Sequence, residues 1–400
     1  VFALLPEILA SDVLVELHDQ AREQVLEDMA EDRLTAIFDA LESHEAADVI
    51  ADMPKEEAAL ILSRIARGDF QDVQKLLGYR EDTAGGIMQL GLVAVNKEIT
   101  VRQAKEAVRR AAEKVENIAN VYVVDLDNTL VGIMPIRKLL LARDETAIPR
   151  LMEPAEHWVT ADVDQEEVAR IFKKYDLLSL PVVDNNRRLL GRIVVDDVLD
   201  VIDAEATEDL YRMGGVHDDE RVTDSPLRSV KRRMPWLFIN LFTALMAAAV
   251  VIAFKDTIQA FVILAAFLPV VAGMGGNAAT QTMTVVIRGL AMGDLDFTRT
   301  KTVLIKEMTT GLVNGVAIGV FLGLVAYLWN GNYMLGIILA LTLIANLFVA
   351  GSAGAFVPIM LRKLRVDPAS ASSVFVTTFT DVFGFFSYLG LATLFLKFLL

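Results

Sequence analysis

The C-terminal part of the chain contains five apolar stretches, at about 236–254, 258–287, 303–329, 333–361 and 374–400. A helix needs about 20 apolar residues to cross the hydrocarbon of a bilayer, and each stretch meets or nearly meets that length. Helices satisfy their own backbone hydrogen bonds in lipid, so the pattern predicts an all-α transmembrane bundle of five helices. The 54% of apolar residues is above the roughly 45–50% of soluble proteins and agrees with this interpretation.

The second apolar stretch carries polar side chains at a helical spacing. In PVVAGMGGNAATQTMTVVIR, spacings of three or four positions place on one helix face Asn277, Thr280, Gln281, Thr284 and Arg288. An unpaired polar group in hydrocarbon costs roughly several kcal/mol, so this face must contact other helices or water. We interpret Asn277, Thr280 and Gln281 as pore-lining residues.

The last apolar stretch contains a carboxylate. Its sequence SSVFVTTFTDVFGFFSYL predicts one helix face with Ser373, Thr377, Thr380, Asp381, Gly384 and Tyr388. A carboxylate inside a membrane helix costs about 2.5–3.5 kcal/mol by insertion scales, so such a residue indicates a functional site. The alternative is a structural ion pair, but no Lys or Arg lies at matching depth, and Arg288 falls at a helix end.

The chemistry of these side chains predicts a divalent cation. Carboxylate, hydroxyl, amide and carbonyl oxygens suit Mg²⁺ or Ca²⁺. Thiolate ligands are excluded because the chain has no cysteine, and its four histidines all lie before residue 218. The single carboxylate of Asp381 makes a thin pore wall for five helices. Two copies about a two-fold axis would bring two Asp381 carboxylates to one ion, which predicts a homodimer in the lipid bilayer.

Charge is unevenly distributed along the chain. Residues 1–230 hold 26 Lys or Arg and 47 Asp or Glu, whereas residues 231–400 hold 12 and 6. This balance does not indicate a nucleic-acid partner; the acidic part is either a solubilising surface or one that collects cations.

Basic residues also predict the orientation in the membrane, because they concentrate on the cytosolic side. One side of the predicted spans holds Arg228, Lys231, Arg232, Arg233, Arg288, Arg299, Lys301, Lys306, Arg362, Lys363 and Arg365. The other side holds Lys255 and Lys397. We therefore expect an integral protein of the plasma (inner) membrane with cytosolic N-terminal domains and an outside C-terminus.

The first 234 residues predict three further parts. Residues 1–80 show apolar residues at helical spacing, as in LTAIFDALESHEAADVI, and predict an α-helical N-domain. Residues 81–203 contain two similar units, each a helix, a VYVVD or LPVVD strand, a polar turn, an LVGI or LLGRI strand and a helix. This repeat resembles a tandem pair of α/β CBS domains. Residues 204–234 follow as an acidic connecting helix and linker, before the membrane domain at 235–400.

The resemblance to CBS pairs implies a nucleotide cleft, which the residues do not favour. The family pattern has Ser or Thr three residues before an Asp that holds ribose. The second unit keeps Asp197 but has Val194 at the hydroxyl position, and the first has Pro135 and Lys138. Nucleotide binding in the CBS cleft is therefore doubtful on sequence grounds.

Acids continue along the predicted helix DDVLDVIDAEATEDLYRM, which Gly214 and Gly215 end. Its first acids suit the positive N-terminus of a helix. The helix N-terminus does not explain the later acids, which lie further along the helix and repel one another as clustered carboxylates. We interpret Glu205, Glu208 and Asp209 as part of a face that a cation neutralises.

The whole chain resembles the MgtE family of magnesium channels. The most specific residues are GMGGNAATQTMTVVIRGL (273–290), GDLD (293–296) and TDVFGF (380–385). The resemblance implies a homodimer with the pore on its axis, Asp381 as the ion-selecting carboxylate and a backbone oxygen from Thr377. It also implies that regulatory Mg²⁺ closes the channel by binding between Asp164, Glu166, Asp176, Asp197, Asp200, Glu205, Glu208 and Asp209.

The predicted function is thus a channel that imports Mg²⁺ down its electrochemical gradient and is closed by Mg²⁺ at acidic cytosolic domains. One alternative is a coupled secondary transporter of divalent cations such as Mg²⁺ or Co²⁺; inverted repeats, typical of transporters, are not evident among the five stretches. A less favoured alternative is a membrane-anchored nucleotide sensor. An enzyme is not expected, since no catalytic constellation or phosphate-binding loop is present.

Overall fold

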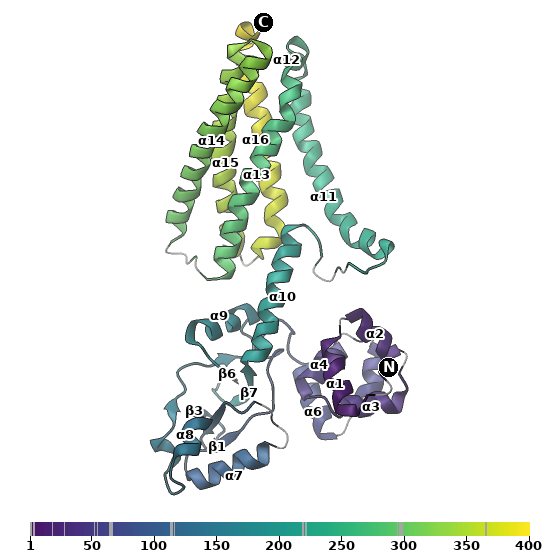
Figure 1. Ribbon diagram of the computed structural model, residues 1–400, viewed down its shortest axis with the longest axis vertical. Coiled ribbons are helices and arrows are strands. Elements are labelled where there is room, and N and C mark those ends of the chain that lie inside the picture. The colour runs from purple at the N-terminus through teal and green to yellow at the C-terminus, as the bar shows by residue number, and fades with distance from the viewer. Residues whose placement is uncertain are drawn as a thin grey trace. The chain divides into compact units, whose positions relative to one another are not determined.

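The structure is a computed structural model of residues 1–400. It describes all residues except 1, 3, 4, 18, 28, 52, 54, 64–66, 113, 114, 116, 218, 219, 221, 294, 296–298 and 365. The chain divides into two compact units, Val1–Asp203 and Ala204–Leu400, which are described separately (Figure 1).

The first unit begins with short helices. They are α1 (Glu7–Glu16), α2 (Asp19–Glu27), α3 (Glu31–Phe38), α4 (Ser43–Ala51), α5 (Lys55–Leu62) and α6 (Arg67–Leu76). Buried side chains such as Leu14, Ile37, Phe38 and Ile50 come from successive helices and share one core with the second half of the unit. The expectation of helices in residues 1–80 agrees with this arrangement.

Two small sheets form the rest of the first unit. The first has the order β1 (Ala94–Asn96), β2 (Asn120–Val124), β3 (Leu130–Pro135) and β4 (Glu153–Pro154), with helices α7 (Val101–Ala111) and α8 (Ile136–Leu141) and the 3₁₀ turn η2 (Ile148–Arg150). The second has the order β5 (Val159–Thr160), β6 (Ser179–Val183) and β7 (Leu189–Val194), with helices α9 (Gln165–Tyr175) and α10 (Val195–Met213).

The two sheets repeat one pattern of pairing. In each, a first strand pairs in parallel with a second, which pairs antiparallel with a third, and the register shifts at Val123/Val124 and at Val182/Val183. The two polar turns bond to each other, because Leu130 N donates to Arg187 O at 2.9 Å and Leu189 N donates to Asn128 O at 3.0 Å. The internal repeat predicted from sequence is therefore a pair of units that face each other.

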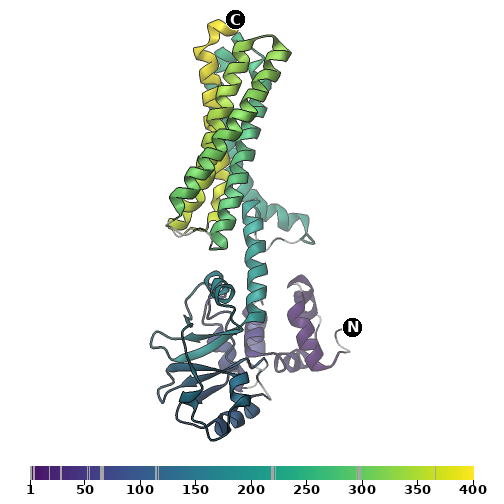
Figure 2. The same cartoon turned by 60° about the vertical axis from the view of Figure 1, so that its left-hand side comes forward.

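The second unit contains long helices that run side by side (Figures 1 and 2). They are α11 (Pro226–Ala253), α13 (Leu264–Ala291), α14 (Thr300–Asn330), α15 (Tyr333–Lys363) and α16 (Pro368–Leu394), with short helices α12 (Lys255–Ala260) and α17 (Leu396–Leu399). The C-terminus and α12 lie at one end of this bundle, and the C-terminal ends of α13 and α15 lie at the other (Figure 1).

Length and composition alone identify four spans in the described part of the chain, namely Pro226–Ala253, Thr300–Asn330, Tyr333–Lys363 and Ser373–Leu394. The fifth long helix, α13, has 28 residues, but its glycines and polar side chains lower its hydropathy. Two predicted boundaries were wrong. The 258–287 stretch is divided between α12 and α13, and the 374–400 stretch ends at Leu394 before α17 begins.

Glycines bring two of the long helices into close contact. Gly311, Gly315, Gly319 and Gly323 are buried on α14. A Cβ added at these glycines would lie 2.4 to 2.8 Å from backbone atoms of α15, from Leu347 O to Gly336 O. Small residues at every fourth position thus allow the backbones of α14 and α15 to touch.

Candidate ion pathway and acidic clusters

Helix α13 has one buried and one exposed face. The buried face contains Val271, Gly275, Ala279 and Met283. The polar residues predicted as a stripe are instead exposed in the single chain, namely Asn277, Thr280, Gln281, Thr284 and Arg288. A Cβ added at the neighbouring Gly273 or Gly276 would meet no atom within 4 Å, so this face is open along its first turns. The stripe is a surface of the single-chain bundle.

The polar residues that the sequence places on one face of α16 differ in burial. Ser373, Thr377 and Asp381 form a partly exposed row, whereas the adjacent row of Thr380, Gly384 and Tyr388 is buried. The six residues lie within an arc of about 100° on the helix, as the spacing predicts, but their exposure differs. Residues 380 and 381 are about 100° apart around a helix, and packing against α13 and α15 covers only one of them.

The carboxylate of Asp381 is half-buried and has no hydrogen-bond or ion-pair partner in the part of the chain that the structure describes. Thr377, one turn earlier, donates its hydroxyl to Ser373 O at 2.8 Å, and its carbonyl accepts from the Thr380 hydroxyl at 2.9 Å. The carbonyl oxygen keeps little capacity for an ion in this arrangement. Of the motif residues quoted above, Asp294 and Asp296 lie outside the described residues.

A second membrane carboxylate is fully paired. Glu307 on α14 is buried, and its Oε1 accepts from Lys306 Nζ at 2.7 Å while its Oε2 accepts from the Thr282 hydroxyl at 3.3 Å. A buried carboxylate with two donors is a structural link between α13 and α14. Asp381 therefore differs from Glu307, because the described part of the chain supplies no donor or cation to its carboxylate.

Three of the predicted regulatory acids lie at the two ends of α9. Asp164 caps the helix by accepting from Glu166 N at 2.9 Å. Glu166 lies 3.7 Å from Arg170, and Asp176 follows the helix in the left-handed conformation, with φ of 50°. Asp164 and Glu166 are adjacent in space, but Asp176 is at the opposite end of the helix.

Asp197 lies in a buried polar network at the start of α10. Gln89 Nε2 donates to Asp197 Oδ2 at 3.0 Å, and Gln89 Oε1 accepts from Arg192 at 3.2 Å. His44 Nε2 of α4 is 3.9 Å from Asp197 Oδ1. Burial raises the pKa of Asp197 to about 7, and burial together with Arg192 lowers the pKa of His44 to about 4. Sequence reasoning found Asp197 but not the side chains around it.

The remaining predicted acids follow along α10. Asp200 is exposed at its side chain, and its pKa is raised by desolvation and by Glu16. In the second unit, burial raises the pKa of Asp209 to about 6, with Asp367 and Glu205 adding to the effect. Glu208 forms an ion pair with Arg212. Glu205, Glu208 and Asp209 therefore do occupy one charged region.

Sequence reasoning missed Asp367 and Arg212 in this region. Arg212 Nη1 is 2.8 Å from Asp367 Oδ2, and Asp367 Oδ1 accepts from Ala369 N at the start of α16. The Asp-Pro pair at 367–368 is a usual helix-start signal and could have identified the position. Among the described residues, no group of three or more Asp, Glu or His side chains is close enough to hold a metal ion.

Lys138 and Asp197, at the family's ribose-binding position in the two repeats, both have partners within the chain. Lys138 Nζ in the first repeat is 2.5 Å from Glu153 Oε1, and Asp197 in the second is bonded by Gln89. These contacts describe the two side chains in the structure, and whether the CBS cleft binds a nucleotide stays a prediction.

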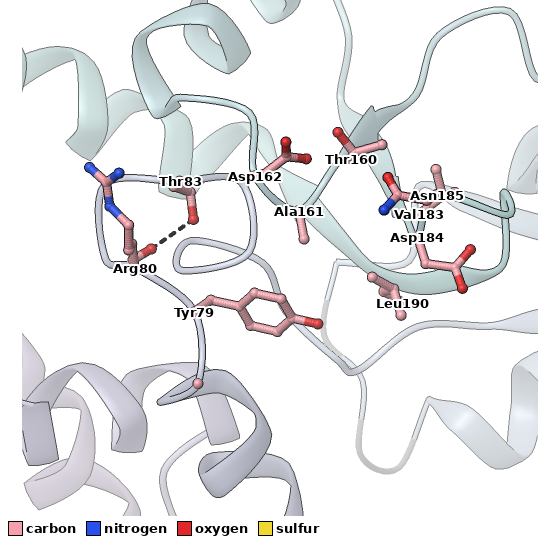
Figure 3. Close-up of a pocket in the computed structure, with 11 residues that line it drawn as sticks. Tyr79, Arg80, Thr83, Thr160, Ala161, Asp162, Val183, Asp184, Asn185 and Leu190 are labelled. Carbon is pink, nitrogen blue, oxygen red and sulfur yellow. Dashed lines mark hydrogen bonds between the residues drawn. The ribbon is translucent and has the colours of Figure 1, made fainter.

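A separate pocket of about 510 Å³ lies beside the second sheet (Figure 3). It is bounded by the loop after α6, where the Thr83 hydroxyl donates to Arg80 O at 2.7 Å, and by the turn after β6. Tyr79 extends into it from the loop side (Figure 3). Its other polar residues include Asp162, Asp184 and Asn185. None of the predicted site residues lines this pocket.

Family comparisons cover most of the chain. A model described as the MgtE intracellular N domain matches residues 1–82, a CBS domain model matches residues 148–204, and a divalent cation transporter model, MgtE, matches residues 268–391. A solved structure of the cytosolic domain of the Mg²⁺ channel MgtE in complex with ATP is 36% identical, with a TM-score of 0.49; it covers 50% of this chain and 82% of that one.

Whole-length relatives carry the same description. The magnesium transporter MgtE of Thermus thermophilus is 36% identical over 405 residues, which cover 99% of this chain and 89% of that protein. The magnesium transporter MgtE of Bacillus subtilis is 33% identical over 386 residues, which cover 96% and 86%. That of Enterococcus faecalis is 36% identical over 82% of this chain and 72% of that protein. The chain therefore belongs to the MgtE family of magnesium transporters.

Proposed function

We propose that this magnesium transporter is a channel, which imports Mg²⁺ down its electrochemical gradient as a homodimer in the plasma (inner) membrane. Its cytosolic acids bind Mg²⁺ when the ion is abundant, and the channel then closes. Membership of the family supports magnesium as the transported ion. The channel mechanism, the dimer, the direction of transport and the closure by the ion are the steps that we add.

The observation that carries the proposal is the exposed polar face of α13 beside the unpartnered carboxylate on α16. The two helices pack together, with the Cβ of Thr380 only 3.3 Å from where a Cβ of Gly275 would lie. Asn277, Thr280 and Gln281 are unfavourable against lipid, so they need water or a second protein surface. A second copy covering this face would enclose a polar path and supply a second Asp381.

The ion fits the available oxygen atoms. Mg²⁺ keeps several of its waters and binds through one or two carboxylates, so a path lined by hydroxyl and amide groups can pass it in hydrated form. Two Asp381 carboxylates would balance its charge on the two-fold axis. Uncharged stripe residues shape the path, and Asp381 selects the ion.

Closure by Mg²⁺ follows from the acids of the charged region on α10. At low Mg²⁺, the carboxylates of Glu205, Asp209 and Asp367 repel one another, which is the cause of part of the raised pKa of Asp209. At high Mg²⁺, ions bridge acids and favour the closed form. A switch from 1:99 to 99:1 needs about 5.5 kcal/mol of differential binding, which several weak sites can share.

Ion flux tests the proposal. Full-length protein in liposomes with an internal Mg²⁺ indicator is compared with Asp381→Asn and with Asp256→Asn, which removes an exposed carboxylate from α12. We expect at least about a tenfold loss of Mg²⁺ uptake, or 1.4 kcal/mol, for Asp381→Asn alone. Undiminished uptake in that variant contradicts the pore assignment. Uptake that stops when Na⁺ and H⁺ gradients are collapsed indicates coupled transport instead of a channel.

A further inference from the structure

An asparagine in the middle of α15 lies at the meeting point of three membrane helices. Asn346 is 0% exposed, and its Nδ2 donates to Val271 O of α13 at 3.1 Å. Its other polar atom, Oδ1, has no hydrogen-bond partner among the residues described. The apolar run around it gives no functional pattern in the sequence.

Two glycines create the space for this side chain. A Cβ added at Gly275 of α13 would lie 2.4 Å from Asn346 Nδ2, and one added at Gly384 of α16 would lie 2.8 Å from the same atom. Both distances are shorter than real carbon contacts, so alanine fits at neither position while Asn346 is present. The amide is therefore enclosed between α13 and α16. Asn346 fits because positions 275 and 384 carry no side chain, and larger residues there would displace it.

Stability alone does not explain an asparagine here. A buried carbonyl oxygen without a donor is destabilising, and on average a hydrogen bond between membrane helices offsets only part of that cost. Leucine has nearly the same shape and would avoid the cost. Thr342, one turn earlier on α15, has a second buried oxygen without a partner among the described residues. This region of α15 is thus more polar than packing requires.

The position of Asn346 relates it to transport. Gly275 is two residues before Asn277 of the exposed stripe, and Gly384 is three residues after Asp381. A contact that fixes Gly275 against Gly384 therefore fixes the rotation and the height of the stripe relative to Asp381. We propose that Asn346 is a positioning residue for magnesium transport, which holds α13 and α16 in register through its hydrogen bond to Val271 and its fit between Gly275 and Gly384.

The test separates positioning from stability. Full-length protein with Asn346→Leu keeps the side-chain shape and loses the donor. We expect its melting temperature in detergent to equal or exceed that of the wild type, while Mg²⁺ uptake into liposomes falls at least tenfold. Uptake within twofold of wild type overturns the proposal. A parallel loss of uptake and melting temperature also overturns it, because that result describes a merely structural residue.

A second pair of variants covers the case in which Asn346→Leu does not fold. Gly275→Ala places a methyl group against the amide, and Asn346→Ala removes the amide. We expect Gly275→Ala to lower the melting temperature, and the double variant Gly275→Ala/Asn346→Ala to recover it without recovering uptake. Recovery of both properties, or of neither, overturns the proposal.

The inference rests on the proposed function in one respect. The register of α13 against α16 matters most for transport if the stripe and Asp381 line the same ion path. The two can fail separately. Normal uptake in Asp381→Asn with lost uptake in Asn346→Leu removes the pore assignment and leaves the positioning role. The reverse result removes the positioning role alone.

Discussion

Arg212 and Asp367 form an ion pair that ties the last turn of α10 to the first residues of α16. The guanidinium Nη1 is 2.8 Å from Asp367 Oδ2, and a second ion pair joins Arg212 to Glu208. The same guanidinium lowers the pKa of Asp209, which burial, Asp367 and Glu205 raise. Arg212 thus serves as a counter-ion in the region where we propose that Mg²⁺ binds.

The first prediction concerns competition between this arginine and the ion. In Arg212→Met the acids lose their internal cation, so we expect the Mg²⁺ concentration that half-closes the channel to fall. Partly exposed ion pairs are worth up to about 1 kcal/mol, which corresponds to a shift of roughly twofold to fivefold. Flux measured across a series of internal Mg²⁺ concentrations gives the value.

Arg228→Met is the matched control for this prediction, since Arg228 forms its ion pair with Asp224 at 3.3 Å. Asp367→Asn removes an acid and is expected to shift the half-closing concentration upward. An unchanged concentration in Arg212→Met would show that the guanidinium does not compete with Mg²⁺.

The second prediction concerns pH and the partly buried side chains of His44 and Asp197, which lie 3.9 Å apart. The folded pKa of His44 is lowered to about 4 from 6.5, so its contribution to stability is present above pH 6.5 and is lost as pH falls toward 4. The folded pKa of Asp197 is raised to about 7 from 3.8, so its contribution is present at low pH and is lost as pH rises through 7. The two effects oppose each other.

We therefore expect a weak pH dependence in the wild type and two opposite slopes in the variants. Without Mg²⁺, His44→Gln should become more stable as pH falls from 7 to 4, and Asp197→Asn should become less stable, each by up to about 3 kcal/mol. Urea unfolding is followed by Trp158 fluorescence in a background with Trp236→Phe and Trp329→Phe, which confines the signal to the first unit. If the free energy of unfolding changes with pH in the same direction in both variants, the opposite pKa shifts of His44 and Asp197 are contradicted.

The sequence predicted the helical interiors well and their ends less well. Five apolar runs indicated the long helices, because burial in lipid requires apolar length. Residues 258–263 are largely apolar, so hydropathy did not separate the end of α12 and the following turn from α13. Local signals were more reliable where they have a specific chemistry: the helix that contains Asp197 ends before Gly214 and Gly215, and Gly215 has a φ of +68°.

Side-chain environments depended on contacts that sequence does not give. Helical spacing placed Thr380 and Asp381 on one face, but packing buries the first and leaves the second half-exposed. The contact from Gln89 to Asp197 joins residues that are 108 positions apart. Asn346 lies in an apolar run with only Thr342 as a polar neighbour one turn away, and this short pattern does not indicate a function. Asp381, by contrast, was identified because a carboxylate in a membrane helix is costly wherever it points.

The third prediction concerns the close packing of α14 on α15. Gly319→Ala adds a methyl group 2.7 Å from Ala340 O, and the backbone of α15 must move to accept it. Overpacking of this kind costs about 1–3 kcal/mol, so the melting temperature in detergent should fall. Gly390→Ala on α16 is the matched control, because its Cβ would meet no atom within 4 Å and alanine is the better helix former. Equal melting temperatures for the two variants would mean that the helices do not touch at Gly319.

The fourth prediction uses the absence of cysteine from the chain to locate water in the membrane domain. A cysteine at Asn277 should react with a membrane-impermeant, positively charged thiol reagent, because the stripe lies in an aqueous path. A cysteine at Val316, which is 46% exposed on the apolar surface of α14, should react at least tenfold more slowly, because lipid covers it. High Mg²⁺ should slow the reaction at position 277 by closing the path or occupying it, and should leave position 316 unchanged. Mass spectrometry of the labelled protein gives both rates. Equal reactivity at the two positions would place the stripe against lipid or within a dry contact, and the ion path would then have to run elsewhere in the bundle.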